Sequence, residues 1–264
     1  MRSVAGAGVV VTGGGSGIGA ALARRFVAEG ARVVVNDLDP AAAEAVAESC
    51  GAAAVPADAA AEDGVSTLIA AARGVLGEID LFCANAGIAR GGGADSEEAD
   101  WDASWQVNVM AHIRAARLLL PGWLDRGSGH LICTVSAAGL LTMLGSAPYS
   151  VTKHAVLGFA EWLAATYAHR GITVQAVCPQ GVRTPMLAGI SPSGEMILGQ
   201  SAITPEAVAD AVIAGIADGR FLILPHPEVA GMYAGRAADP DRWLRGMNKL
   251  QRRVEEAAGR PDSA

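Results

Sequence analysis

The feature that most constrains the fold is a regular alternation of short apolar runs with longer Ala-rich segments of helical character. Most of the short runs are continuously apolar, which is typical of strands that helices bury on both faces. The expected strands are 9–12, 32–36, 53–56, 81–84, 130–135, 173–178 and 221–224, and the expected helices are 17–29, 40–49, 62–76, 100–120, 147–169 and 205–217. This order predicts an α/β fold, a doubly wound (Rossmann-type) parallel sheet of seven strands with helices on both faces.

No linker, repeat or change of composition divides the chain, so a single domain is expected over residues 1–264. The segment at about 184–203 lacks clear periodicity, and we expect a substrate loop there because loops of that length are usually lids or binding segments. At about 239–257 a helical segment places Trp243, Met247, Leu250 and Val254 at helical spacing. Two interpretations of this helix stay open: it docks on its own domain, or it packs across a subunit interface.

Composition and charge exclude several classes of function. The net charge is −7 and the basic residues are dispersed, which argues against a protein that binds nucleic acid. No uninterrupted apolar stretch reaches the length of about 18 residues that a membrane helix needs. The four cysteines lie far apart, and neither they nor the five histidines have metal-ligand spacing. The sequence thus predicts a cytoplasmic protein with reduced thiols, no metal, no nucleic-acid partner and no membrane contact.

A glycine-rich turn joins the first expected strand to the first expected helix. It reads Thr12-Gly13-Gly14-Gly15-Ser16-Gly17-Ile18-Gly19, with the spacing G-x-x-x-G-x-G. Glycines let a backbone approach a pyrophosphate closely, and the helix N-terminus offers N–H groups to its charge. Asp37 ends the second expected strand, where a carboxylate can accept hydrogen bonds from the ribose hydroxyls of NAD and repels the 2′-phosphate of NADP. We therefore expect NAD as the cofactor, although Asp37 can also be read as an ordinary turn acid.

Tyr149 and Lys153 form a candidate catalytic pair at the start of the expected helix 147–169. Residues four apart share one helix face, so the phenol and the ammonium can enter the same cleft. A nearby cation favours the phenolate and lowers the pKa of a tyrosine. Ser136 directly follows the fifth expected strand, at the sheet edge where ligands bind in doubly wound folds. Its hydroxyl can hold a substrate oxygen for proton transfer.

Together with the Asn85-Ala86-Gly87 stretch and Asn108, these motifs resemble the short-chain dehydrogenase/reductase family over about residues 9–184. The resemblance implies that Tyr149 is the general acid/base and that Ser136 positions the carbonyl. Lys153 would bind the nicotinamide ribose and lower the pKa of the tyrosine. Asn108 would hold a water in a proton relay from the lysine to solvent.

The same resemblance assigns further cofactor contacts. It implies that Asn85, Ala86 and Gly87 line the cofactor cleft, that Asp58 contacts the adenine, and that Val182 and Thr184 bind the nicotinamide carboxamide. Gln180 departs from the family pattern, which usually has glycine after the proline. The resemblance therefore does not define how the chain around Gln180 is arranged toward the substrate. The family forms homodimers or homotetramers, and the expected helices 100–120 and 147–169, with Gly158 permitting close approach, suit subunit packing.

These observations predict an NAD-dependent enzyme that acts on a secondary alcohol or ketone. An apolar substrate is favoured if the residues after Ser136 and those of the loop fold over the nicotinamide. These are Leu140, Leu141, Met143, Leu144, Met186, Leu187, Ile190, Met196, Ile197 and Leu198. Several of them can instead belong to the core, and Arg90 and Arg183 leave an acidic substrate open. The rival functions are a non-enzymatic NAD-binding sensor or scaffold and an NADP-linked ketone reductase.

Overall fold

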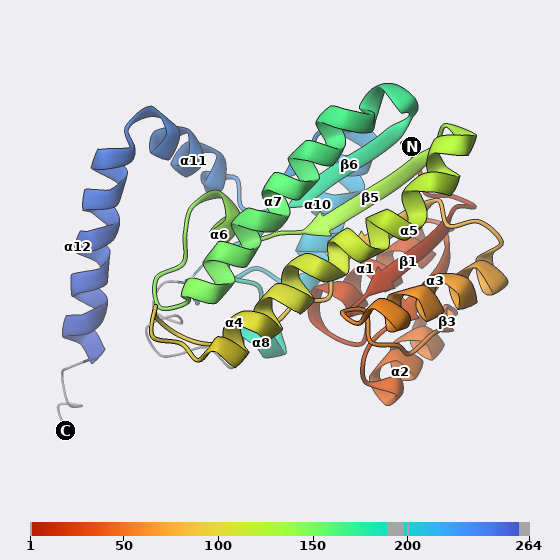
Figure 1. Ribbon diagram of the computed structural model, residues 1–264, viewed down its shortest axis with the longest axis horizontal. Coiled ribbons are helices and arrows are strands. Elements are labelled where there is room, and N and C mark those ends of the chain that lie inside the picture. The colour runs from red at the N-terminus through yellow and green to blue at the C-terminus, as the bar shows by residue number, and fades with distance from the viewer. Residues whose placement is uncertain (1, 189–197, 200, 259–264) are drawn as a thin grey trace.

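The structure, a computed structural model, describes residues 2–188, 198–199 and 201–258. Its strands are β1 Gly8–Thr12, β2 Arg32–Asn36, β3 Ala53–Ala54, β4 Leu81–Ala84, β5 Gly129–Thr134, β6 Ile172–Val177 and β7 Leu222–Ile223. All pair in parallel in the order β3-β2-β1-β4-β5-β6-β7, so the predicted seven-stranded, doubly wound sheet is confirmed (Figure 1). The strand order reverses between β1 and β4, which is where ligands bind in open α/β sheets.

Helices cover both faces of the sheet. They are α1 Gly17–Ala28, α2 Pro40–Cys50, α3 Glu62–Leu76, α4 Glu98–Trp105, α5 Ala111–Arg126, α6 Ala137–Leu140, α7 Ala147–Tyr167, α8 Pro185–Ala188, α10 Pro205–Asp218, α11 Glu228–Ala238 and α12 Pro240–Ala258, with a π-helical turn η1 at Gln106–Met110 and a 3-10 turn η2 at Ala168–Arg170. Figure 1 shows α5 and α7 in front of the sheet and α1 and α10 behind it. No helix within the described residues is both long and apolar enough to cross a membrane.

Two apolar cores lie on either side of the sheet because successive strand residues face opposite ways. Val10, Phe82 and Leu131 point into the core under α3, α5 and α7. Their neighbours Val9 and Leu81 point into the core under α1, α2 and α10. This explains why the strands are continuously apolar in sequence, since both of their faces are buried.

Several elements differ from the sequence prediction, among them the short helices α6 and α8, which it did not contain. The helix expected at 100–120 is α4, η1 and α5 in succession, so a π-helical turn that includes Asn108 interrupts it. β3 has only two residues, Ala53 and Ala54, although the Val55 N–H still donates to the Val35 carbonyl of β2 at 2.9 Å. Helix α11 is absent from the prediction, and its sequence contains two glycines, which disfavour a helix. The helical segment expected at about 239–257 is α12, and Ile190, Met196 and Ile197 of the expected loop lie outside the described residues.

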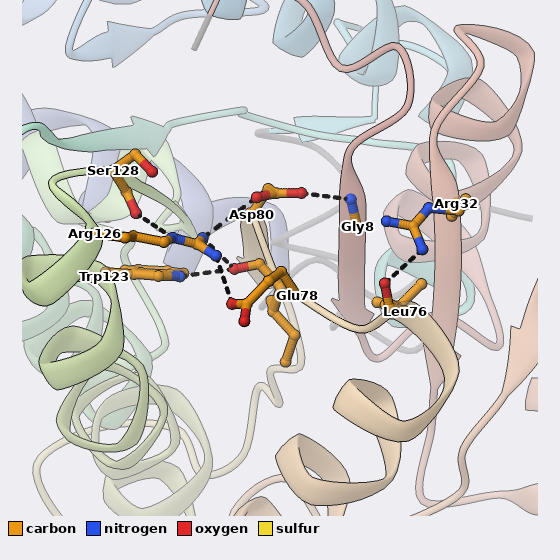
Figure 2. Close-up of polar contacts among 9 residues, drawn as sticks. Gly8, Arg32, Leu76, Glu78, Asp80, Trp123, Arg126 and Ser128 are labelled. Carbon is orange, nitrogen blue, oxygen red and sulfur yellow. Dashed lines mark hydrogen bonds and ion pairs between the residues drawn. The ribbon is translucent and has the colours of Figure 1, made fainter.

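A cluster of hydrogen-bonded polar side chains lies at the amino ends of the strands (Figure 2). The Asp80 carboxylate accepts a hydrogen bond of 2.9 Å from the Gly8 N–H at the start of β1, and it lies 3.4 Å from the Arg126 guanidinium. Arg126 also donates to the Ser128 carbonyl, and it pairs with the Glu78 carboxylate at 2.6 Å. Asp80 therefore joins β1, β4 and the end of α5 through one side chain.

Replacing Asp80 by alanine should destabilise the fold without altering the residues at the carboxyl ends of the strands. Loss of a charged acceptor that is only partly exposed is expected to lower the free energy of unfolding by about 1 to 2 kcal/mol. Urea unfolding of Asp80→Ala measures this. Glu78→Ala is the control, because its carboxylate is 74% exposed and its ion pair should contribute under about 0.5 kcal/mol. Equal midpoints for the two variants would contradict the assignment.

Candidate active site

A cleft of about 860 Å³ opens at the carboxyl ends of the strands. It is lined by the residues that follow β1, β2, β4, β5 and β6, so it lies across the point where the strand order reverses. Nearly all of the site residues expected from the sequence line it: Gly13, Ser16, Gly17, Ile18, Gly19, Asp37, Asp58, Asn85, Ala86, Gly87, Ser136, Tyr149, Lys153, Val182 and Thr184. The other two, Thr12 and Asn108, are buried and do not line it.

The glycine-rich turn forms a cradle that only glycines can make. Gly13 and Gly17 have φ values of +61° and +49°, a conformation that side chains disfavour. A Cβ on Gly19 would lie 2.1 Å from the Gly13 carbonyl oxygen, so the two segments touch through bare backbone. The first turn of α1 contains no acidic residue, and the Ser16 side chain makes no capping hydrogen bond. The N–H groups at this end of α1 are therefore available to an anion in the cleft.

Thr12 supports this cradle from behind. Its hydroxyl accepts hydrogen bonds from the N–H groups of Asn85 at 3.0 Å and Ala86 at 3.1 Å, and it donates to the Cys83 carbonyl. The Asn85 amide in turn donates to the Thr12 carbonyl at 3.0 Å and accepts from the Thr134 hydroxyl at 3.0 Å. Thr12 and Asn85 thus lock the ends of β1, β4 and β5 together.

The acids expected at the adenine end lie along the same cleft. The Asp37 carboxylate accepts hydrogen bonds from the N–H groups of Gly15 at 2.9 Å and Asp39 at 3.1 Å, which fixes it beside the glycine cradle. Asp58 is exposed at the cleft edge. Asn36 was missed by the sequence analysis: its amide donates to the Val55 and Ala57 carbonyls, while its Oδ1 is buried without a partner in the described structure.

Tyr149, Lys153 and Ser136 meet at the inner end of the cleft. Both Tyr149 and Lys153 lie in the first two turns of α7, and the lysine Nζ is 5.5 Å from the centroid of the phenol ring. The lysine Nζ also donates to the Thr134 carbonyl at 2.9 Å. Ser136 follows β5 with φ 154°, and it is the single non-glycine residue of positive φ in the described part of the chain. Such backbone outliers concentrate at functional sites.

Burial is the main influence on the pKa values of Tyr149 and Lys153. Burial raises the pKa of Tyr149 above its ordinary value, and a hydrogen bond with Ser136 only partly offsets this. Burial also lowers the pKa of Lys153 to about 8. Desolvation of the phenol is therefore the largest influence on this pKa in the chain by itself, and the lowering of the tyrosine pKa by Lys153 and a bound nicotinamide stays a prediction.

Asn108 clamps the segment after β4 against α7. Its Oδ1 accepts from the Ile88 N–H at 2.9 Å, and its Nδ2 donates to the Ile88 carbonyl at 2.9 Å and the Thr152 hydroxyl at 3.1 Å. A Cβ on Gly87 would lie 3.4 Å from the Asn108 Oδ1 and 3.5 Å from the Lys153 Nζ. Asn108 therefore lies directly behind the cleft wall, beside the lysine, with its side chain bound to protein groups.

The segment after β6 lines the cleft and is held by hydrogen bonds within the protein. Thr184 donates its hydroxyl to the Val182 carbonyl at 3.2 Å, and Val182 forms an isolated parallel bridge with Ile203. The backbone N–H of Gln180 donates to the His226 Nδ1 at 3.1 Å, so His226 fixes the peptide at the position that departs from the family pattern. His226 has no function in the sequence prediction, because it lies 46 residues after Gln180 and no local motif links the two.

The expected apolar walls are largely present. Leu141, Met143, Leu144, Met186, Leu187 and Leu198 line the cleft, whereas Leu140 is fully buried and belongs to the core. Arg90 and Arg183 are exposed and do not line the cleft, so neither offers a charge to an acidic substrate there. Across the described residues, no group of three or more histidine, cysteine or carboxylate side chains lies close enough to hold a metal.

The comparisons with known proteins agree with this geometry. The family model for short chain dehydrogenases matches residues 7–194. A 1-deoxy-11-beta-hydroxypentalenate dehydrogenase from Streptomyces exfoliatus is 36% identical over 229 residues, which cover 83% of this chain and 82% of the relative.

Two solved structures are also similar. A short chain dehydrogenase/reductase from Burkholderia phymatum in complex with NAD has a TM-score of 0.83 and 27% identity, covering 91% of this chain and 96% of that one. A 3-ketoacyl-(acyl-carrier-protein) reductase from Brucella melitensis complexed with NADH has a TM-score of 0.76 and 29% identity, covering 84% and 96%. Since the family model matches most of the chain and a curated relative agrees over the same region, this protein belongs to the short-chain dehydrogenase/reductase family and is an oxidoreductase of alcohol and ketone groups.

Proposed function

We propose that the protein interconverts a secondary alcohol and its ketone with NAD(H), using Tyr149 as the general acid/base. The observation that carries the proposal is the half-buried Tyr149, whose side chain lines the cleft together with those of Ser136 and Lys153. That end is continuous with the glycine cradle at the start of α1.

The described residues fit NAD. A pyrophosphate suits the cradle of Gly13, Gly17 and Gly19, because a Cβ on Gly13 or Gly19 would collide with backbone and the helix N-terminus offers N–H groups that no side chain caps. The fixed carboxylate of Asp37 suits the adenine-ribose hydroxyls and disfavours a 2′-phosphate. Asp58, Asn85, Ala86, Gly87, Val182 and Thr184 are proposed as further cofactor contacts along the same cleft. When bound, NAD supplies the site that accepts or returns a hydride.

The protein groups handle the proton. Because burial raises the pKa of Tyr149, its phenol is protonated at neutral pH and can donate to the oxygen of a ketone. A positive charge brought into the cleft would lower this pKa and favour the reverse transfer during alcohol oxidation. Ser136 is proposed to hold the substrate oxygen, Lys153 to stabilise the phenolate and bind the nicotinamide ribose, and Asn108 to support a proton relay beside the lysine.

The substrate is proposed to be mainly apolar. Leu141, Met143, Leu144, Met186 and Leu187 line the same cleft as Ser136. Methionine side chains adapt readily to different apolar shapes, and a polyol would leave its hydroxyls unpaired against such walls.

Assembly into a homotetramer is proposed from the outward faces of α4 and α7. Trp105, Val151 and Trp162 expose large apolar side chains on these helices, and Gly158 has open space where a side chain would lie. Contiguous apolar surface on helices commonly marks an interface between subunits.

The function is tested by following NADH formation from NAD with a panel of hydrophobic secondary alcohols, and NADPH formation from NADP in parallel. Turnover with NAD and a preference for apolar over polyol substrates are the expected results. Tight NADH binding without turnover of any alcohol would instead favour the NAD-binding sensor or scaffold.

Asp37→Ala should relax the preference for NAD. Like charges placed together cost several kcal/mol, so removing this carboxylate should lower the ratio of kcat/KM for NAD to that for NADP by at least on the order of tenfold. Glu44→Ala is the matched control, since that exposed acid on α2 does not line the cleft. An unchanged ratio in Asp37→Ala would refute the assigned contact.

A further inference from the structure

The outer end of the cleft is built by a part of the chain that the family model does not match. That model ends at residue 194, whereas Met232 on α11 and Trp243, Met247 and Leu250 on α12 all line the cleft. In Figure 1, α11 leaves the body next to α6 and α7, and α12 runs from it along the side of the molecule.

Helix α12 turns one apolar stripe toward the cleft. Trp243, Met247, Leu250 and Val254 recur at the spacing of one helix face, and the three that precede the buried Val254 are cleft-lining side chains. The opposite face carries exposed charges, among them Arg245, Lys249, Arg252 and Arg253. An amphipathic helix buries its apolar face where water is excluded, so the stripe marks this end of the cleft as an apolar compartment.

Arg236 anchors this wall to the catalytic segment. Its guanidinium donates to the carbonyls of Leu140 and Leu141, the latter at 2.8 Å, and to the His154 Nε2 at 3.0 Å. The His154 Nδ1 donates to the Ser150 carbonyl at 2.8 Å, so the same chain of contacts reaches α7 beside Tyr149 and Lys153. The end of α11 is therefore held at a fixed place relative to the residues proposed to carry out the reaction.

We propose that α12 is the outer wall of the substrate site and selects alcohols and ketones with a large apolar body. The oxygen of such a substrate would lie at Tyr149, and its far end would contact Trp243 and Leu250. A small substrate held at Tyr149 would lack the apolar body that contacts α12. This inference rests on the proposed function. It adds that the substrate is large and that Trp243 and Leu250 discriminate by its size.

The test compares cyclohexanol with the much larger cyclododecanol in NAD-dependent oxidation by Trp243→Ala and Leu250→Ala. Loss of apolar contacts should lower kcat/KM for cyclododecanol by on the order of tenfold or more, while kcat/KM for cyclohexanol stays unchanged. The matched control is Leu244→Ala, since Leu244 lies on the same helix, is 61% exposed and does not line the cleft. Unchanged circular dichroism and NADH affinity show that each variant is folded.

An equal loss of kcat/KM with the two alcohols, or the same loss in Leu244→Ala, would contradict the proposal that α12 selects large substrates. A second measurement does not depend on turnover: the dissociation constant of cyclododecanone from the NADH complex, measured by calorimetry. If neither alcohol reacts, the proposed function fails. The proposed contact between α12 and the substrate is then tested by the dissociation constant of cyclododecanone alone. Weaker binding in Trp243→Ala then supports it, whereas binding that is absent in the parent protein or unaffected by the substitution overturns it.

Discussion

Replacement of Tyr149 by phenylalanine is expected to lower kcat by on the order of 10³-fold, with NADH affinity retained. The half-buried Tyr149 lines the cleft together with Ser136 and Lys153, so removing its hydroxyl removes the proposed proton donor while the ring still fills its place. The measurement pairs steady-state kinetics on the best alcohol of the panel with fluorescence titration of NADH.

Tyr167→Phe is the matched control for this change. Tyr167 ends the same helix, is half-buried and packs edge-to-face on Trp162 at 5.9 Å between ring centroids, and it does not line the cleft. Its activity should equal that of the parent protein. Substantial turnover in Tyr149→Phe would mean that another group transfers the proton, and equal loss in both variants would show that the effect is structural.

Gly19→Ala is expected to abolish cofactor binding in practice. The new Cβ would lie 2.1 Å from the Gly13 carbonyl oxygen and 2.7 Å from the Asn85 Nδ2, so the first turn of α1 would have to move away from the cradle. We expect the dissociation constant of NADH to rise by at least on the order of 100-fold, a change of about 2.7 kcal/mol in binding free energy.

The control for this substitution is Gly74→Ala on the exposed side of α3. No atom lies within 4 Å of the position that its Cβ would take, so this change should leave NADH affinity untouched. It should also raise the stability of the fold by about 0.5 to 1 kcal/mol, because alanine favours the helix over glycine. Tight NADH binding by Gly19→Ala would show that the turn is not the pyrophosphate site.

The amino-acid sequence alone determined the architecture of this protein. Strands buried on both faces leave continuous apolar runs, and helices between them leave a different periodicity, so the seven-stranded parallel sheet could be predicted from local pattern. The cleft residues could be predicted for a related reason. In a parallel sheet the residues after successive strands meet at one edge, and the turn at Gly13, Asp37, Asn85 and Ser136 each follow such a strand.

The electrostatic state of the inner cleft was decided by the tertiary structure. The i, i+4 spacing of Tyr149 and Lys153 correctly places both in one cleft, but spacing contains no information on burial. Desolvation raises the pKa of the phenol and lowers that of the ammonium, against the direction that a simple charge pair predicts. The Thr134 carbonyl that receives the lysine comes from another strand.

Contacts between distant segments were likewise settled only by folding. Arg236 reaches Leu141 and His154, and His226 fixes Gln180, through hydrogen bonds that no local pattern encodes. The stripe on α12 predicted an amphipathic helix and left its partner open between the same domain and another subunit. Periodicity reveals which face of a helix is apolar, whereas the surface that this face meets depends on where the preceding chain places the helix. Here Arg236 fixes the end of α11, and side chains of the α12 stripe line the cleft of the same chain.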